Sequence, residues 1–108
     1  MGLTTKIYSL IYEGQYEQAI EKILVFEDSL HKYSLLGYCY YQIKDYDKSA
    51  QSYKACLALE YKAEYKRYYA FCLYHMGSYE EAKQACMTID APELLAACLL
   101  YTSPSPRD

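Results

Sequence analysis

Two adjacent stretches decide the fold: SLLGYCYY at residues 34–41 and KDYDKS at residues 44–49. Apolar and small residues recur three or four positions apart through and beyond each stretch, which is typical of one face of a helix. They are Leu36, Tyr40 and Ile43 in the first case, and Ser49, Tyr53 and Cys56 in the second. The two stretches therefore predict two helices joined by a tight turn.

The second stretch occurs three times in the chain, as GQYEQA at 14–19, KDYDKS at 44–49 and GSYEEA at 77–82. The tyrosines are 30 and 33 residues apart, on the low side of the roughly 34-residue tetratricopeptide period. The recurring positions are the tyrosines Tyr16, Tyr46 and Tyr79 and the small residues Ala19, Ser49, Ala82, Gly37 and Ala70. The chain thus resembles the tetratricopeptide motif, which implies antiparallel helical hairpins stacked into a solenoid.

Each recurring position has a physical reason. The small residues stand where two antiparallel helices cross too closely for a bulky side chain. The turn tyrosine fills the wedge between one hairpin and the next. Gly14 and Gly77 can adopt the positive φ that ends a helix at little cost. Lys44 takes the equivalent place in the middle repeat, so we expect slight backbone strain there.

Residues at the helix ends support this pattern. Ser78 and Glu81 form a capping-box sequence before one helix, and Asp45 is a candidate N-cap of another. Asp90, with Pro92 in the first turn, is expected to open the last helix. The expected helices span residues 3–13, 16–28, 31–43, 46–59, 63–75, 79–88 and 92–101.

The predicted fold is all-α, a right-handed tetratricopeptide-type α-solenoid of about three and a half helical hairpins. The repeats are placed at 3–30, 31–61 and 63–90, with a partial repeat at 92–101. Because the first interval is short, we expect an abbreviated connection near residues 28–31. The last helix has no partner helix, so four of its leucines are expected to be uncovered: Leu94, Leu95, Leu99 and Leu100. This pattern is expected for an N-terminal fragment of a longer solenoid. Residues 102–108 are expected to be a disordered tail that resembles a translation artefact.

Composition limits the possible functions. A net charge of −3, with Lys and Glu interspersed, argues against nucleic-acid partners, which require a basic face. No apolar stretch reaches the roughly 20 residues that span a bilayer, so membrane insertion is not expected. Five cysteines lack C-x-x-C spacing and fall in apolar helical patterns, which indicates buried free thiols in a reducing compartment. The chain has sixteen tyrosines and two phenylalanines, which suits a fold with many half-buried helix faces, because tyrosine combines a large ring with a hydroxyl that needs a partner.

Catalytic and ligand-binding motifs are missing from the sequence. His31 and His75 are 44 residues apart and have no carboxylate or cysteine at metal-ligand spacing. No phosphate-binding glycine loop, nucleophile elbow or H-E-x-x-H motif is present. We therefore expect no enzyme activity, no cofactor, no metal and no small-molecule substrate.

A peptide-binding groove is the candidate functional site, because the first helix of each hairpin lines the concave side of such a solenoid. Its positions are Tyr8, Ile11 and Tyr12, then Ser34, Tyr38, Tyr41 and Gln42, then Arg67, Phe71, Tyr74 and His75. A row of rings at helical spacing is also typical of a core. Tyr38, Tyr40 and Tyr41 cannot all face inward, however, which favours a groove for an extended apolar or proline-rich peptide.

The same faces argue against a clamp for C-terminal carboxylates. Tetratricopeptide co-chaperones with such a clamp carry Lys, Asn and Arg at these positions. Here the corresponding residues are Thr4, Tyr8, Leu35, Glu64 and Tyr68. The carboxylate clamp is therefore absent.

Residues 3–82 resemble one family more closely: tetratricopeptide repeat protein 30, the tetratricopeptide subunit of intraflagellar transport complex B. The matching residues are Tyr8-Ser9-Leu10-Ile11, Tyr16-x-x-Ala19-Ile20, the block 34–41, Tyr46, Ala50, Tyr53, Tyr65 through Leu73-Tyr74, and Tyr79-x-Glu81-Ala82. The block at 34–41 is the most specific, because the generic motif does not require it.

That resemblance implies a tightly wound solenoid that wraps a proline-rich segment of a neighbouring complex B subunit. It also implies a location in the cilium or flagellum and the cytoplasm, with a role in cilium assembly and in polyglutamylation of axonemal tubulin. Two other functions stay open. One is a generic cytosolic tetratricopeptide scaffold for another peptide, and the other is a repeat domain that regulates an enzyme.

Overall fold

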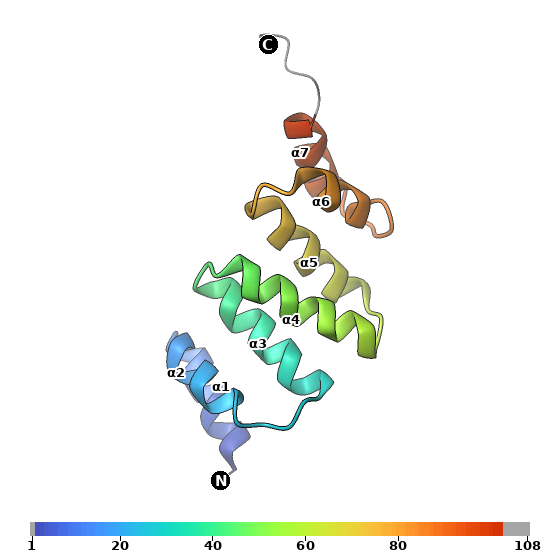
Figure 1. The fold of residues 1–108 in the computed structure, drawn as a ribbon. Helices are drawn as coiled ribbons and strands as arrows, with labels where there is room; N and C mark the ends of the chain where they lie inside the picture. Colours follow the sequence, from blue (N-terminus) through green and yellow to red (C-terminus); the bar gives the residue numbers. More distant parts are fainter. Residues whose placement is uncertain (1, 103–108) are drawn as a thin grey trace.

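The computed structural model describes residues 2–102 and consists of seven helices in that range (Figure 1). They are α1 (Leu3–Tyr12), α2 (Tyr16–Ile23), α3 (Leu30–Gln42), α4 (Tyr46–Leu59), α5 (Ala63–His75), α6 (Tyr79–Cys86) and α7 (Pro92–Thr102). Each helix packs mainly against the next one in the chain, which gives antiparallel hairpins. The predicted all-α tetratricopeptide-like array is therefore confirmed.

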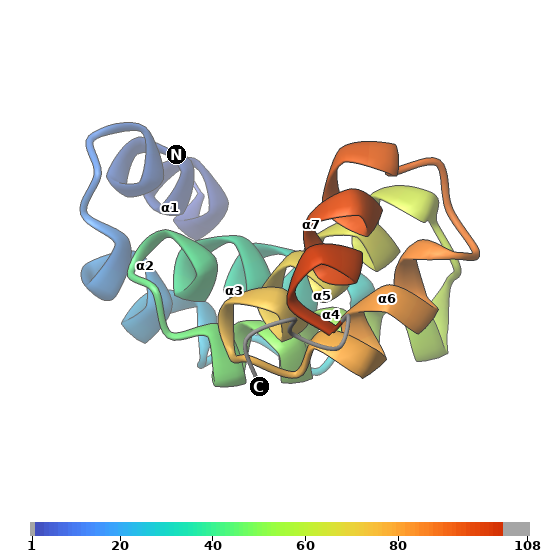
Figure 2. The same cartoon turned by 90° about the horizontal axis from the view of Figure 1, so that it is seen from above.

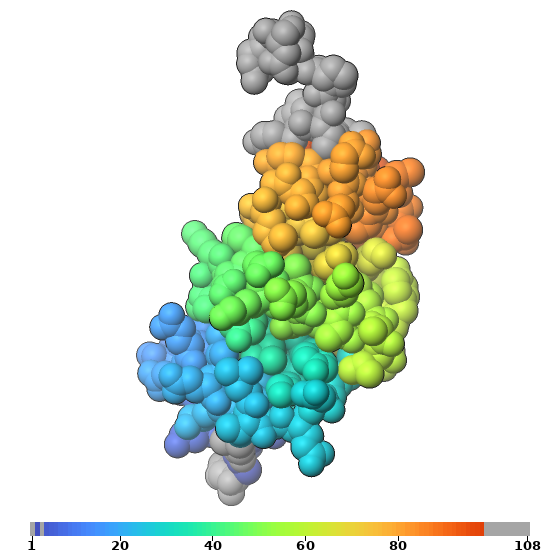
Figure 3. Space-filling view, in the orientation of Figure 1, coloured from blue at the N-terminus to red at the C-terminus, as the bar shows by residue number. Residues whose placement is uncertain are grey.

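The hairpins follow one another along a single axis. The molecule measures 57 × 26 × 18 Å, and the colours of the space-filling view succeed each other from one end to the other (Figure 3). In the view from above, α1 and α7 stand at opposite sides of the array (Figure 2). Such a shape leaves the outer face of every hairpin open, as expected for a solenoid.

The core consists of two clusters joined by a middle layer. The first cluster centres on Ile7, Ile23 and Cys39 and is built from α1, α2 and α3. The second centres on Ala82, Cys86 and Cys98 and is built from α5, α6 and α7. Between them, α4 contributes a further set of buried side chains: Ser49, Ala50, Ser52, Tyr53 and Cys56.

The close helix crossing at the middle hairpin depends on small residues. Ser49 is fully buried, and its Oγ donates a hydrogen bond of 2.7 Å to the Gly37 carbonyl oxygen. The Cys72 thiol lies 3.3 Å from the same Oγ and donates to it. This chain of polar contacts links α3, α4 and α5 through the core. Ala19 and Ala82, the small residues of the other repeats, are also fully buried.

The same turn closes all three hairpins. Gly14, Lys44 and Gly77 have φ values of 80°, 68° and 85°. In each case the next residue's N–H donates to the carbonyl oxygen five residues earlier, at 2.8 Å for Gln15 and 2.9 Å for Asp45 and Ser78. This is the Schellman ending of a helix, in which the left-handed residue favours glycine. The strain expected at Lys44 follows from its left-handed conformation.

Two of the three predicted caps are not formed. Asp45 caps α4, with Oδ1 accepting from the Lys48 N–H at 3.4 Å. Ser78 occupies the N-cap position of α6, but its side chain makes no capping hydrogen bond. The helix α7 begins at Pro92, so Asp90 lies one residue before the cap position. Asp90 therefore does not cap this helix.

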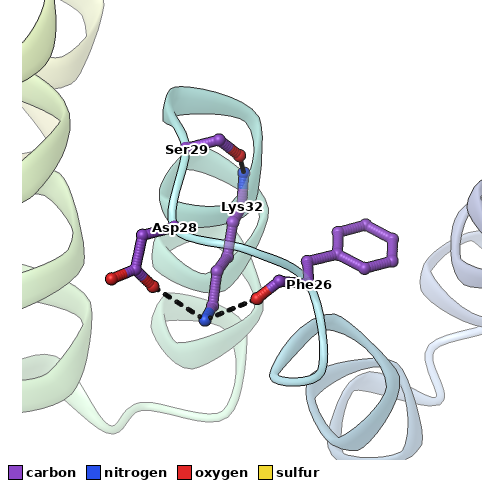
Figure 4. Close-up of polar contacts among 4 residues, drawn as sticks. All are labelled: Phe26, Asp28, Ser29 and Lys32. Carbon is purple, nitrogen blue, oxygen red and sulfur yellow. Dashed lines mark hydrogen bonds and ion pairs between the residues drawn. The ribbon is translucent and has the colours of Figure 1, made fainter.

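The first repeat is short because its second helix, α2, is short, and not because the connection near residues 28–31 is abbreviated. The helix α2 ends at Ile23, whereas the sequence pattern predicted a helix to residue 28. Residues 24–29 form an irregular connection held by the next helix (Figure 4). The Lys32 ammonium donates to the Phe26 carbonyl oxygen at 3.0 Å and to Asp28 Oδ1 at 3.1 Å. The hydrogen bond from Lys32 to Asp28, together with the positive charge of Lys32, lowers the pKa of the Asp28 carboxyl.

The connection ends in a cap that the sequence analysis missed. Ser29 is the N-cap of α3, and its Oγ accepts from the Lys32 N–H at 3.2 Å. The capping hydroxyl and the anchored Lys32 together explain why the chain turns into α3 at Leu30.

The last helix differs from the expectation in two respects. Leu94 was expected to be uncovered, but it is buried in the second core cluster, and Leu95 is partly buried against that cluster. Thr102, assigned to the tail, belongs to α7. The side chains of Leu99 and Leu100, and the remainder of the predicted tail at 103–108, lie outside the described residues.

Candidate peptide-binding groove

Two neighbouring hollows lie between α3 and α5, on the face that the sequence analysis assigned to peptide binding. The smaller, of about 230 Å³, is lined by Ser34, Tyr38, Tyr53, Glu64, Tyr65 and Tyr68. The larger, of about 340 Å³, is lined by Tyr41, Glu64, Arg67, Tyr68 and Phe71. Glu64 and Tyr68 line both hollows. The two hollows therefore form one continuous surface, called here the α3–α5 groove.

Stacked rings form the base of the α3–α5 groove. Tyr53 is 3 % exposed and stacks on Tyr68, with ring centroids 5.0 Å apart and planes at 6°. Tyr41 meets the Tyr68 ring edge-on at 5.6 Å. Because each ring is supported by another, little side-chain freedom remains to be lost when a ligand binds. The base is pre-formed.

The ring contacts continue past the groove to the next turn. Tyr41 contacts Tyr46 edge-on at 5.5 Å, and Tyr46 stacks on His75 at 4.5 Å with planes at 15°. Tyr46 is the turn tyrosine of the middle hairpin, while His75 belongs to the following one. Tyr16 makes a similar contact with Tyr38 of the next hairpin, at 6.3 Å. These tyrosines thus lie between successive hairpins.

Tyr38 and Tyr41, on the α3 wall of the groove, keep their hydroxyl protons over the physiological range. Burial raises the pKa of Tyr38, and the neighbouring Tyr16 adds to the effect. Burial also raises the pKa of Tyr41, with a further contribution from Tyr46. The α3 wall of the groove therefore presents two neutral hydroxyl groups that can donate hydrogen bonds to peptide carbonyls.

Five of the eleven predicted groove residues line the two hollows: Ser34, Tyr38, Tyr41, Arg67 and Phe71. His75 is exposed and Tyr74 contacts it edge-on at 5.6 Å, so both lie at the end of α5 beyond the larger hollow. Gln42 is exposed at the end of α3 and lines neither hollow.

The predicted positions on α1 do not join this groove. Tyr8 is half exposed and faces His31, with ring centroids 6.2 Å apart. Tyr12 is 94 % exposed, whereas Ile11 packs partly against the first core cluster. None of the three lines the hollows between α3 and α5.

Four groove residues were absent from the predicted set: Tyr53, Glu64, Tyr65 and Tyr68. A signal for two of them was present, because Glu64, Arg67, Tyr68 and Phe71 are spaced to share one face of a helix. Tyr53 was assigned to the core, and it is indeed buried while its ring forms the floor of a hollow. A motif position cannot reveal this double role.

The charges of the groove do not suit a terminal carboxylate. Glu64 adds an acidic residue to the lining of both hollows, and Leu35, another clamp position, is buried in the first core cluster. Arg67 is the cation of the larger hollow. A site with one acid and one base among tyrosines suits a largely uncharged, extended peptide better than an anionic chain end.

A larger hollow, of about 430 Å³, lies on the other side of α5 against α6. Its lining is mostly charged and polar: Lys66, Tyr69, Leu73, Glu80, Glu81, Gln84 and Ala85. Only Tyr69 contributes a ring. The arrangement provides less apolar contact for a peptide than the α3–α5 groove does.

The described residues contain little that could support catalysis. Within residues 2–102, no group of three His, Cys, Asp or Glu side chains could hold a metal ion. All five cysteines are free and buried, and burial raises the pKa of Cys39, Cys56 and Cys86 to about 11. Such thiols are protonated and shielded, hence poor nucleophiles. Among the described helices, none is both long and apolar enough to span a bilayer.

The sequence is similar to intraflagellar transport 70A and tetratricopeptide repeat 30 proteins. No family model matches the chain. It is 40 % identical over 95 residues to intraflagellar transport protein 70A of Xenopus laevis, covering 81 % of this chain and 14 % of that protein. It is 38 % identical over 95 residues to the tetratricopeptide repeat protein 30 homolog of Aedes aegypti, covering 84 % of this chain and 14 % of the relative. The chain thus spans about one seventh of the length of these curated relatives.

Proposed function

Because the chain belongs to the tetratricopeptide repeat protein 30 family over the segment that it shares with its relatives, we propose that it forms part of a non-enzymatic adaptor subunit of intraflagellar transport complex B. In this proposal the α3–α5 groove binds a proline-rich segment of a neighbouring complex B subunit. The complete protein would act in the cilium and the cytoplasm, in cilium assembly and axonemal tubulin polyglutamylation.

The observation that carries the binding proposal is the pair of tyrosine-lined hollows that share Glu64 and Tyr68. Proline-rich segments adopt an extended helix in advance, so they lose little entropy on binding, and their rings pack on flat aromatic surfaces. The α3–α5 groove offers such surfaces from Tyr38, Tyr41 and Tyr68 on a supported base. Neutral tyrosine hydroxyls would bind the peptide carbonyls between prolines.

A titration of the 108-residue chain with fluorescent proline-rich segments of complex B subunits tests this proposal. We expect micromolar binding that weakens roughly tenfold or more in Tyr38→Ala, because a truncated aromatic anchor removes its whole contact surface. Tyr61→Ala is the matched control, since Tyr61 is 57 % exposed in the connection between α4 and α5 and lines neither hollow. Its affinity should equal that of the unmodified chain.

Three outcomes would count against the proposal. If the chain has a helical circular dichroism spectrum and binds none of these segments, the groove is not a peptide site. If it binds proline-rich peptides of unrelated proteins but no complex B segment, it is a generic tetratricopeptide scaffold. Equal loss in Tyr38→Ala and Tyr61→Ala would also show that binding occurs outside the groove.

A further inference from the structure

Glu64 occupies an unusual place in the α3–α5 groove, because it is the charged residue that lines both hollows. Within the described part of the chain, the ion pairs are Lys32–Asp28, Lys62–Glu60 and Lys83–Glu80, so Glu64 has no cationic partner there. Arg67, one turn along the same helix, lines only the larger hollow. The smaller hollow therefore contains an acid and no base.

The remaining lining of the smaller hollow also favours a cation. Four of its six residues are tyrosines, and the other two are Ser34 and Glu64. Aromatic faces attract cations through their quadrupole, and the effect grows when the site is partly desolvated. Tyr65 already has such a contact within the chain, because the Lys62 ammonium lies 5.6 Å from its ring centroid. The tyrosine rings and the Glu64 carboxylate thus both favour a cation in the smaller hollow.

We propose that the smaller hollow binds a basic side chain, Arg or Lys, carried by the proline-rich segment. This inference rests on the proposed function and specifies its ligand further. An arginine suits the hollow, because its planar guanidinium can stack on a tyrosine while donating hydrogen bonds to the Glu64 carboxylate. Arg67 in the larger hollow disfavours a second cation there, so prolines occupy that part of the groove.

An effect of Glu64 on helix stability has to be distinguished from its proposed role in binding a basic side chain. Glu64 lies in the first turn of α5, where an acid interacts favourably with the helix dipole. Glu17 holds the equivalent place in the first turn of α2, is exposed, and lines neither hollow. Glu17→Gln therefore removes the same dipole interaction without touching the groove.

The test uses two fluorescent polyproline probes, each about twelve residues long, measured by anisotropy with the 108-residue chain. One carries a central arginine, and the other carries citrulline, which has the same shape without the charge. We expect the arginine probe to bind roughly three- to tenfold more tightly, as for an ion pair assisted by aromatic rings. Glu64→Gln should abolish that preference and leave the citrulline affinity unchanged, whereas Glu17→Gln should preserve it.

A charge exchange strengthens the test. Glu64→Arg should bind a probe with central glutamate more tightly than the arginine probe, reversing the order. Equal affinities for the arginine and citrulline probes in the unmodified chain would overturn the inference while leaving the proposed groove intact. A similar loss of preference in Glu17→Gln would also overturn it. Failure of a folded chain to bind either probe would contradict the proline-binding groove itself.

Discussion

Gly37 on α3 faces the ring of Tyr53 on α4 so closely that a side chain at position 37 has no room. A Cβ atom there would lie 2.7 Å from Tyr53 Cε2 and 2.8 Å from Cζ. The ring cannot move away easily, because it is buried and stacks on Tyr68 at 5.0 Å. The stretch at residues 34–41 therefore contacts Tyr53, the floor of the α3–α5 groove, through Gly37.

We expect Gly37→Leu to lower the free energy of unfolding by at least about 3 kcal/mol, since overpacking a tight crossing forces the helices apart. That loss is a large part of the stability of a small domain, so the urea midpoint of the variant should fall strongly. Urea denaturation followed by circular dichroism measures the effect. An unchanged midpoint would show that the helix crossing is misplaced.

A double-mutant cycle attributes this effect to Tyr53. Gly37→Ala should destabilise the unmodified chain by about 1–3 kcal/mol through the clash. In a Tyr53→Leu background the same change should be neutral or stabilising by up to about 1 kcal/mol, because alanine favours helices over glycine. If Gly37→Ala costs the same in both backgrounds, the clash lies with another residue.

Ser49 gives a second prediction, because it joins three helices through its hydroxyl. Its Oγ donates to the Gly37 carbonyl and accepts from the Cys72 thiol. Ser49→Ala should cost only about 1 kcal/mol, since alanine fits the space and leaves a helical carbonyl that already has a partner in its own helix. Ser49→Val should cost more, about 1–3 kcal/mol, by overpacking the crossing. Equal costs would mean that the hydrogen bonds, and not the space, determine the residue at this position.

The repeat pattern was sufficient to predict the fold because its signals are local. Tyr16, Tyr46 and Tyr79 mark the turns, and the small residues mark the crossings. The end of α2 could not be predicted in this way. Residues 24–28 are compatible with a helix, but Lys32 stabilises the irregular path by binding Phe26 and Asp28 from the following helix. A contact across a connection overrides local preference.

The groove was harder to predict than the fold, because it depends on which side chains meet between hairpins. Tyr38, Tyr41 and Phe71, which the pattern on α3 and α5 assigned to the groove, line the hollows. It also assigned Tyr8 and Tyr12 to the same surface, although α1 contributes to neither hollow. Helical periodicity gives the face of each helix, whereas the rotation between hairpins decides which faces adjoin.

Lys44 provides a stabilising prediction. Its φ of 68° is in the left-handed region, where a side chain costs roughly 1 kcal/mol and glycine costs little. Lys44→Gly should therefore raise the free energy of unfolding by up to about 1 kcal/mol, in spite of the greater freedom of glycine in the unfolded chain. Gly14→Ala and Gly77→Ala, at φ of 80° and 85°, should lower it by a similar amount.

Chemical denaturation of these three variants tests the turn geometry directly. The two glycine positions have no atom within 4 Å of an added Cβ, so any loss there reports backbone strain alone. A destabilised Lys44→Gly variant would contradict the left-handed conformation at that turn.

The buried thiols predict that stability falls in alkaline solution. Burial raises the pKa of Cys39, Cys56 and Cys86 from 9.0 to about 11 in the folded chain. Below about pH 9 the thiols are protonated in both states, and the full stability is present. Between about pH 9 and 11 the unfolded chain loses these protons first, so the free energy of unfolding decreases, by up to about 1.4 kcal/mol per thiol and pH unit.

Urea midpoints at about pH 8 and about pH 10.5 measure this loss, and a chain with Cys39→Ala should show a smaller one. Tyr38 and Tyr41, whose pKa values burial also raises, contribute in the same direction at the upper end of the range. The alanine variant isolates the thiol contribution, because it leaves both tyrosines in place. A midpoint that is constant from about pH 8 to 10.5 would show that the thiols are not held protonated by the core.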